Sequence, residues 1–275
     1  MKSTSTYNLK QSAKKKHHLA MSMNPIIINV NEENISQYPP TCFLNPNNVG
    51  YQIKAEWLKE RFKEGLKIKA LYFENDKKCH GFIEYVPGEH VWRAVEAKDY
   101  LFIHCIWVNP NNFKNKGYGS LLVEECVKDA EKQGKAGVAV IASDGPFMAN
   151  KELFLKNGFR EVQASGVFTL LVKQLRKAED PKFKDYETQL SSCEGVKIVY
   201  SNQCPWVARF ISELPETMKG KELKVDVVEL KTAKQAQTAP SIYAVFNLVS
   251  DGKLLADHYI SNTRFVNIVN KELKP

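Results

Sequence analysis

Residues 101–130 read LFIHCIWV, NPNNF, KNKGYGS and LLVEECVKDA in consecutive blocks. The first block is a continuous apolar and aromatic run of strand length, and Pro110 with its neighbouring asparagines ends it. In the last block apolar side chains recur every three or four residues with charged ones between them, which is typical of an amphipathic helix. The stretch therefore predicts a buried strand, a glycine-containing loop and a helix over residues 120–132.

The loop between this strand and this helix contains Gly117 and Gly119 together with Lys114 and Lys116. The first backbone N–H groups of a helix have no intrahelical partner and carry the positive end of the dipole, so they bind phosphate well. Because glycine has no Cβ, a ligand can approach the backbone closely at both glycines. The pattern predicts a pyrophosphate site over residues 115–120, and the alternative is that the Gly-x-Gly pair merely caps the helix.

The order of these features resembles motif A of the GNAT N-acetyltransferase superfamily, in which a basic-x-x-Gly-x-Gly loop joins a strand to an amphipathic helix. Downstream, the segment LFLKNGF at residues 153–159 resembles motif B of the same family. The loop matches neither the phosphate loop of nucleotide hydrolases nor the dinucleotide-binding fingerprint. The resemblance covers roughly residues 25–175 and implies a mixed central sheet with flanking helices and acetyl-CoA as co-substrate.

The resemblance also implies where the co-substrate lies. In the family the pantetheine arm lies beside the splayed central strand, and the pyrophosphate lies at the motif A loop. The matching residues of this chain are Ile106, Trp107 and Val108 for the arm, and Lys114, Asn115, Lys116, Gly117, Tyr118, Gly119 and Ser120 for the pyrophosphate.

The acid and base of the reaction are less clear from the sequence. The family often uses a tyrosine after the first phenylalanine of motif B, but here Phe154 is followed by Leu155, so another group or a water has to protonate the departing thiolate. His104 is the candidate base, because its pKa range suits proton transfer. Strand alternation places it on the face of Phe102 and Ile106, where a core or cofactor-packing histidine is the alternative.

Two further residues, Glu89 and His90, follow the predicted hairpin and are candidates for lining the acceptor site.

The chain of 275 residues has a net charge of +8. Five of its positive charges are lysines in the first twenty residues, where there is no acidic residue. We therefore expect residues 1–24 to be a disordered basic leader, and we do not expect binding to nucleic acid. No apolar run approaches the roughly 20 residues of a membrane span, and no secretory signal is visible, so we expect a cytoplasmic protein with no membrane partner.

The six cysteines are expected to be reduced thiols, since no pair has Cys-x-x-Cys spacing, and no metal site is predicted. The patterns predict an α/β (α+β) acetyltransferase-like domain over residues 25–175, a charged linker over 176–193 and a smaller α/β domain over 194–275. The elements expected in the first domain are strands at 26–30, 67–73, 80–86, 101–108, 137–142 and 167–172, and helices at 54–66, 120–132 and 151–156.

The smaller domain is predicted to contain a strand at 196–200, Cys204-Pro205 at the start of a helix, a strand at 223–230, a hairpin after Pro240 and a last helix over 263–273. This order resembles the thioredoxin-like fold, in which a cysteine at that helix start has a lowered pKa. Valine stands at 207, where the resolving cysteine of that family would be, and Cys193 could serve only if the fold brought it close. A buried, inert Cys204 on an inherited scaffold is the alternative.

The combination of the two halves resembles the YoaP-like acetyltransferases. We therefore expect an acetyl-CoA-dependent N-acetyltransferase that transfers an acetyl group directly to an amine of a small molecule or peptide. The alternatives are a thiol-redox protein centred on Cys204, which makes Cys204 a second candidate catalytic residue beside His104, and a non-catalytic CoA-binding protein, which the missing tyrosine suggests.

Overall fold

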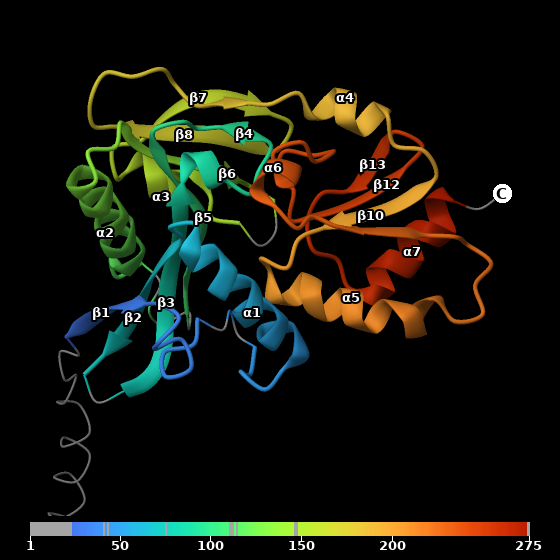
Figure 1. Cartoon of the computed structure of the whole chain (residues 1–275), viewed down its shortest axis with the longest axis horizontal. Coiled ribbons are helices and arrows are strands. Elements are labelled where there is room, and N and C mark those ends of the chain that lie inside the picture. The colour runs from blue at the N-terminus through green and yellow to red at the C-terminus, as the bar shows by residue number, and fades with distance from the viewer. Residues whose placement is uncertain are drawn as a thin grey trace, which may run out of the picture.

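The computed structural model of the chain describes residues 24–40, 42, 44–74, 76–109, 113, 115–145 and 148–273. Residues 1–23 of the predicted leader and Lys114 of the predicted phosphate loop lie outside these described residues. Two α/β units lie side by side in Figure 1, the first built on a seven-stranded sheet and the second on a four-stranded sheet. Within the described ranges, no helix is long and apolar enough to span a bilayer.

The sheet of the first unit has the strand order β1-β2-β3-β5-β6-β8-β7. Neighbouring strands pair antiparallel except β5 and β6, which run parallel and are connected through helix α2. The predicted mixed central sheet is therefore confirmed. Its strands are β1 Pro25–Val30, β2 Lys67–Phe73, β3 Asp76–Pro87, β5 Tyr100–Val108, β6 Gly137–Ser143, β7 Arg160–Ser165 and β8 Phe168–Gln174.

Helices cover both faces of this sheet. The apolar face of α2 (Tyr118–Lys132) packs on one side, and α1 (Val49–Lys63) packs on the other through Trp57 and Leu58. Two short helices complete the unit, η1 (Gly88–His90) after β3 and α3 (Lys151–Leu155) before β7. The sheet is thus buried on both sides, which explains the nearly continuous apolar sequence of its central strands.

Helix α1 begins earlier than the residue pattern predicts. The side chain of Asn48 accepts a hydrogen bond from the backbone N–H of Gly50, which caps the helix at Val49 rather than at residue 54. The helix ends before Gly65, whose φ of 87° belongs to the left-handed region that favours glycine. The added first turn carries Gly50 into the contact with the second unit.

Strand β5 contains a β-bulge next to the predicted base. In the ladder between β3 and β5, Glu84 pairs with Cys105 whereas Tyr85 pairs with Ile103, so β5 has one extra residue at His104. A bulge bends its strand and re-aims the side chains around it. The predicted regular alternation along this strand is therefore wrong beyond His104.

The bulge has two consequences: the side chains of β5 beyond it change to the other face of the sheet, and β5 separates from β6. Phe102 packs in the core on the α1 side of the sheet, whereas Ile106 packs in the core on the α2 side, so the expected common face does not exist. The parallel pairing of β5 with β6 ends at Ile103 and Val140. Residues 104–108 therefore diverge from β6 and leave one edge of β5 without a strand partner in the described part of the chain.

The second unit has a four-stranded sheet in the order β11-β10-β12-β13. Strands β10 and β11 run parallel, and the other two pairs run antiparallel. Helix α5 leads from β10 to β11, with Pro205 at its first position, which suits the fixed φ of proline. The elements are β10 Val196–Tyr200, α5 Pro205–Met218, β11 Asp226–Glu229, α6 Ala233–Ala236, β12 Phe246–Ser250, β13 Lys253–Ala256 and α7 Asn262–Glu272.

The segment predicted as a linker, residues 176–193, contains secondary structure. Strand β9 (Lys182–Phe183) pairs antiparallel with β4 (Val95–Glu96), and helix α4 (Tyr186–Ser191) follows, capped by the side chain of Asp185. This segment is thus fastened to the first unit before it enters the second.

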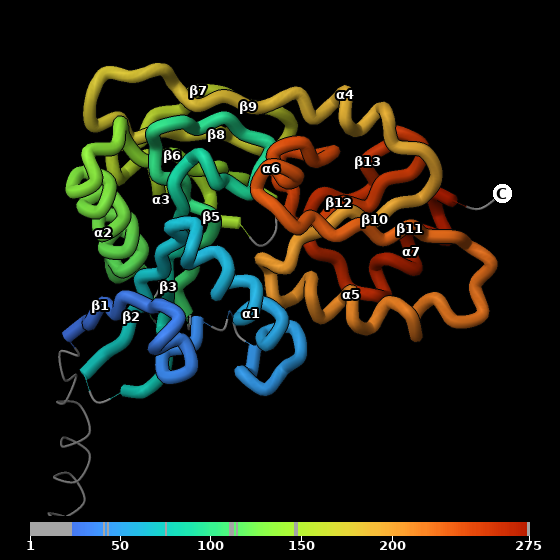
Figure 2. Tube along the Cα trace, viewed as in Figure 1, coloured from blue at the N-terminus to red at the C-terminus, as the bar shows by residue number. Residues whose placement is uncertain are grey.

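The two units share a hydrophobic core. Val199, Leu230 and Ile242 of the second unit belong to the same buried cluster as Phe102 of the first. Figures 1 and 2 show α1 and α5 lying side by side. At this crossing the backbones are so close that a Cβ on Gly50 would lie 2.1 Å from the carbonyl oxygen of Pro205.

Candidate active site

A cavity of about 720 Å³ lies where the two units meet. It extends from the amino end of α2, along the diverging end of β5, to the amino end of α5 and the loop before β12. Both units therefore contribute to its wall. From the first unit the lining includes Lys54, Arg93, His104, Cys105, Trp107 and Gly117, and from the second it includes Gln203, Cys204, Trp206, Tyr243, His258 and Tyr259.

The amino end of α2 presents unpaired backbone donors. Gly117 caps the helix with a φ of 85°, and the first bond to its carbonyl comes from the N–H of Leu121 at 2.9 Å. The N–H groups of residues 118–120 precede this first bond and are open to an anion. A Cβ on Gly117 would have no neighbour within 4 Å, whereas a Cβ on Gly119 would lie 3.2 Å from Leu153. Gly117 is thus required for its backbone conformation, and the space in front of it is free.

The predicted co-substrate residues separate into two groups. Ile106, Trp107, Val108, Asn115, Gly117 and Gly119 line the cavity. Three others are not among the residues that line it. These are Lys116, whose ammonium lies 5.8 Å from the ring centre of Phe113; Tyr118, whose ring packs on Phe73; and Ser120, whose hydroxyl accepts a hydrogen bond from Asn157 at 3.0 Å.

A buried polar cluster forms the inner end of the cavity. The ammonium of Lys54 lies 2.8 Å from Glu84 Oε2, and both side chains are almost fully buried. Gln203 joins the cluster from the second unit, donating to Glu84 Oε1 at 2.7 Å and accepting from Arg93 at 2.6 Å. Burial would raise the pKa of Glu84, but Lys54 and His104 outweigh it and hold that pKa well below its usual range.

His104 has one hydrogen-bonded ring nitrogen and one that faces Glu84. The backbone N–H of Trp92 donates to Nε2 at 3.0 Å, and Nδ1 lies 3.6 Å from Glu84 Oε1. Burial lowers the pKa of His104 to about 4, so the ring is neutral at pH 7. A neutral ring whose Nε2 already accepts a hydrogen bond has no lone pair available for a substrate proton. The geometry therefore favours the alternative of a packing histidine over the predicted base.

Cys204 is the N-cap residue of α5 and lines the cavity. Burial raises the pKa of its thiol, and the N–H groups of Val207 and Trp206 offset this only in part. The lowered pKa that the thioredoxin-like resemblance implies is therefore wrong. Cys193 is not among the lining residues, whereas Cys42 and Cys105 are. The hydrogen bond between these two thiols raises the pKa of Cys42 and lowers that of Cys105.

Several lining residues could not be found by sequence reasoning. Arg93, Gln203 and Tyr243 lie far apart in the sequence, so only the fold brings them together. Two predicted acceptor residues lie elsewhere: Glu89 accepts a hydrogen bond from the backbone N–H of Asp99, and neither it nor His90 is among the lining residues.

Motif B also contributes differently from the family pattern. Leu155, which replaces the tyrosine, is exposed and does not line the cavity, whereas Leu153 and Lys156 on either side do. The next motif B residue, Asn157, bonds both Ser120 of α2 and the carbonyl of Leu153. Motif B therefore fixes the first turn of α2 and does not place an acid in the cavity.

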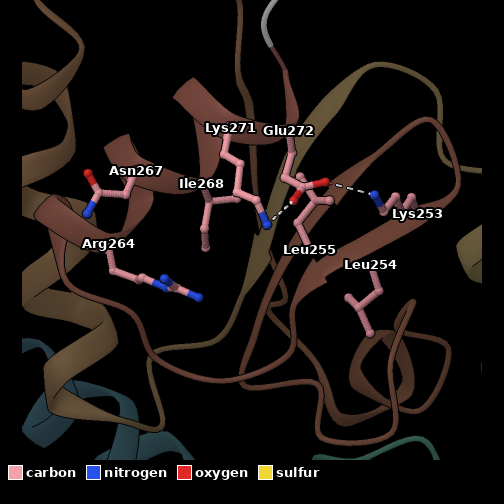
Figure 3. Close-up of a pocket in the computed structure, with 8 residues that line it drawn as sticks. All are labelled: Lys253, Leu254, Leu255, Arg264, Asn267, Ile268, Lys271 and Glu272. Carbon is pink, nitrogen blue, oxygen red and sulfur yellow. Dashed lines mark hydrogen bonds and ion pairs between the residues drawn. The ribbon is translucent and has the colours of Figure 1, made fainter.

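A second, smaller hollow of about 250 Å³ lies between β13 and α7. Figure 3 shows Lys253 and Lys271 pairing with Glu272 at its rim, at 2.9 and 3.3 Å. It contains none of the predicted site residues, and both of its lysines already pair with the carboxylate of Glu272.

Comparison with known proteins agrees with this geometry. Residues 32–159, which lie within the first unit, match the profile of the Acetyltransferase (GNAT) family. Over 250 residues the chain is 28% identical to the "Uncharacterized N-acetyltransferase YoaP" of Bacillus subtilis (strain 168), an alignment that covers 88% of this chain and 98% of that protein. Together the two matches confirm the prediction of an acetyl-CoA-dependent N-acetyltransferase and leave the acceptor open.

Solved structures resemble the first unit more distantly. The PaiA N-acetyltransferase from Thermoplasma acidophilum in complex with coenzyme A has a TM-score of 0.41 at 14% identity, covering 55% of this chain and 99% of that chain. An aminoglycoside 6'-acetyltransferase type Ii has a TM-score of 0.42 at 18% identity, covering 56% and 99%. YncA from Salmonella typhimurium with acetyl-CoA has a TM-score of 0.39 at 16% identity, covering 57% and 98%. At these scores the likenesses add no argument about this chain.

Proposed function

We propose that the protein transfers the acetyl group of acetyl-CoA to an amine inside the cavity between its two units. The observation that carries this proposal is the continuity of the cavity, which connects the amino end of α2 with the diverging end of β5 and then with the second unit. The pyrophosphate is bound by the N–H groups of residues 118–120. The pantetheine arm lies along Ile106, Trp107 and Val108, and the acceptor enters against the second unit.

The chemistry needs few protein groups. The neutral amine attacks the thioester carbonyl carbon, so that a C–N bond forms, the C–S bond breaks, the nitrogen loses a proton and the thiolate gains one. Negative charge develops on the carbonyl oxygen, and fixed N–H donors stabilise it best. The edge of β5 that diverges from β6 beyond Ile103 supplies backbone N–H groups of this kind. Holding both reactants in one buried cavity contributes the remaining acceleration.

We propose that His104 is a positioning residue. Its ring links the backbone of Trp92 to Glu84 across the bulge in β5, and so fixes the strand where the thioester lies. The proton of the amine then leaves through water or another group of the cavity wall.

The second unit is proposed to be a thioredoxin-like fold that forms the acceptor wall. Its strand order, with β10 parallel to β11 and with β12 antiparallel to both β10 and β13, supports this assignment, as does Cys204 at the start of α5. The raised pKa of the Cys204 thiol and the valine at 207 argue against two-thiol redox chemistry.

The test uses two matched glycine variants at the two ends of α2. Both Gly117 and Gly134 have a positive φ and open space around a Cβ, so glutamate strains the backbone similarly at each. G117E places a carboxylate where the pyrophosphate binds and should abolish acetyl-CoA binding in calorimetry, whereas G134E should retain it. Wild-type protein should also release CoA when an amine is added. Equal binding by both variants would contradict the proposed pyrophosphate site.

A further inference from the structure

Arg93 is a buried cation that pairs with no carboxylate of the described residues. Its side chain is 1% exposed and lines the cavity at the boundary of the two units. Three of its five N–H donors are used: Nη1 donates to the carbonyl of Trp92 and to Gln203, both at 2.6 Å, and Nη2 donates to the carbonyl of His104 at 2.9 Å. All three acceptors are uncharged. Among the described residues, the remaining two donors have no acceptor.

The neighbouring side chains do not cancel this charge. Lys54 and Glu84 neutralise each other in an ion pair, Gln203 is uncharged, and the lowered pKa of His104 keeps its ring neutral at pH 7. The buried cluster therefore carries one net positive charge. An uncompensated buried charge is among the costliest features that a protein interior can contain.

The arginine is also shaped for recognition. Its guanidinium lies 4.3 Å from the ring centre of Tyr243, in a stacked arrangement that fixes the planar group. A planar, fixed guanidinium with two free donors matches the two oxygens of a carboxylate. Around it, the cavity wall is aromatic, with Trp107, Trp206 and Tyr259 among the lining residues.

We propose that the acceptor is an amino acid whose carboxylate binds Arg93 while its amine faces the thioester. This inference deepens the proposed function and rests on it for the reaction, but not for the binding of the carboxylate. The bound carboxylate supplies the counter-charge that the chain lacks, and the aromatic wall contacts the amino-acid side chain. Within the described lining, two other groups could supply it: Glu152 of α3, through its carboxylate, and Cys105, by ionising beside Lys54 and Arg93.

The experiment compares each amino acid with the amine that lacks only its carboxylate. The pairs are tryptophan with tryptamine, tyrosine with tyramine, phenylalanine with phenethylamine, and alanine with ethylamine. For at least one pair, kcat/KM should be about 10- to 100-fold higher for the amino acid, the factor expected of a hydrogen-bonded charge pair. Equal or higher values for the amines across all pairs would overturn the proposal.

Two variants show whether Arg93 is responsible. R93Q keeps hydrogen-bonding capacity but removes the charge, and should bring the ratio within a pair close to one. R160Q, which changes an exposed arginine that pairs with Asp180, should leave the ratio as in the wild type. C105S should also keep the ratio, because the acceptor and not this thiol neutralises Arg93. Loss of the ratio in C105S, or its persistence in R93Q, would overturn the assignment.

Calorimetry of the amino acids without acetyl-CoA separates this inference from the proposed function. Binding of an amino acid but not of its matched amine supports the carboxylate site even if no acetyl group is transferred. Acetyl transfer to amines with no amino-acid binding would leave the proposed function standing and overturn the carboxylate site. If no amino acid binds and none is acetylated, the inference is likewise overturned.

Discussion

The ion pair between Lys54 and Glu84 should stabilise the folded protein far more than the other ion pairs of helix α1 do. K54M removes the ammonium and leaves Glu84 with no exposed surface and no cation in contact. The side chain of methionine fills a similar volume, so the main effect of the substitution is electrostatic. Because Glu84 also holds Gln203 of the second unit, the change should weaken both units together.

The separation of 2.8 Å corresponds to an attraction of about 6 kcal/mol at an effective dielectric constant of about 20. Desolvation offsets part of this attraction, and breaking a buried pair from one side typically costs about 3–5 kcal/mol. For a chain of this size that cost lowers the melting temperature by roughly 6–20 °C. K54M/E84Q, which also removes the unpaired negative charge of Glu84, should recover most of the lost stability.

The pH dependence has a definite sign. In the wild type the pKa of Glu84 is depressed in the folded state, so the pair stabilises the fold above the unfolded value of about 4.3 and ceases to do so as pH falls toward the folded pKa. In K54M the largest source of the depression is gone and burial raises the pKa of Glu84. Protonation of Glu84 then removes its unpaired charge in the variant. The difference in stability between K54M and the wild type should therefore become smaller from pH 7 to pH 4.5.

The assay is urea and thermal unfolding followed by tryptophan fluorescence at both pH values. The matched control is K63M on the same helix, which breaks the pair with Glu60 at 2.7 Å, where both side chains are about 60% exposed. K63M should leave the midpoint essentially unchanged, because exposed pairs contribute little. If K54M shifted the midpoint no more than K63M, or if its deficit grew on acidification, the reasoning would be refuted.

Two other predictions concern the contact between the units and the thiol at its edge. G50A should lower the free energy of unfolding in urea by about 1–3 kcal/mol, because a Cβ at this position overlaps the Pro205 carbonyl. V49A, at the neighbouring exposed position, should change the free energy of unfolding little. Equal effects of the two substitutions would contradict the close crossing of α1 and α5. The raised pKa of Cys204 predicts alkylation by iodoacetamide at pH 7 more slowly than a free thiol, with a rate that rises with pH beyond 9; fast alkylation at pH 7, located by peptide mapping, would revive the redox alternative.

Much of the fold could be predicted because its elements have clear periodicity. The central strand and its helix were expected at 101–108 and 120–132 and lie at Tyr100–Val108 and Tyr118–Lys132. Strand β7 was not expected, because Arg160–Ser165 is a largely exposed edge strand with only two apolar residues, Val162 and Ala164. The early start of α1 was missed because its cap is a single asparagine in a loop that contains several.

The loop at the α2 end of the cavity could be predicted from the sequence and the wall at the other end could not, for a physical reason. Asn115, Gly117 and Gly119 line the cavity and belong to one local turn, which the sequence specifies by spacing. The bulge at His104 depends on how β5 pairs with β3, which is a tertiary property. One extra residue in a strand exchanges the two faces of everything beyond it, so alternation misassigned Ile106.

The polar cluster argues that the second unit is part of the catalytic structure. Without Gln203, the Oε1 atom of Glu84 and one donor of Arg93 would lose their partners in a buried site. Each such loss costs about 1–3 kcal/mol or more for charged groups, which is a large part of the marginal stability of a domain. The first unit therefore needs the second to satisfy its own interior. If the second unit also forms the proposed acceptor wall, the stability of the first unit and the choice of acceptor depend on the same residues.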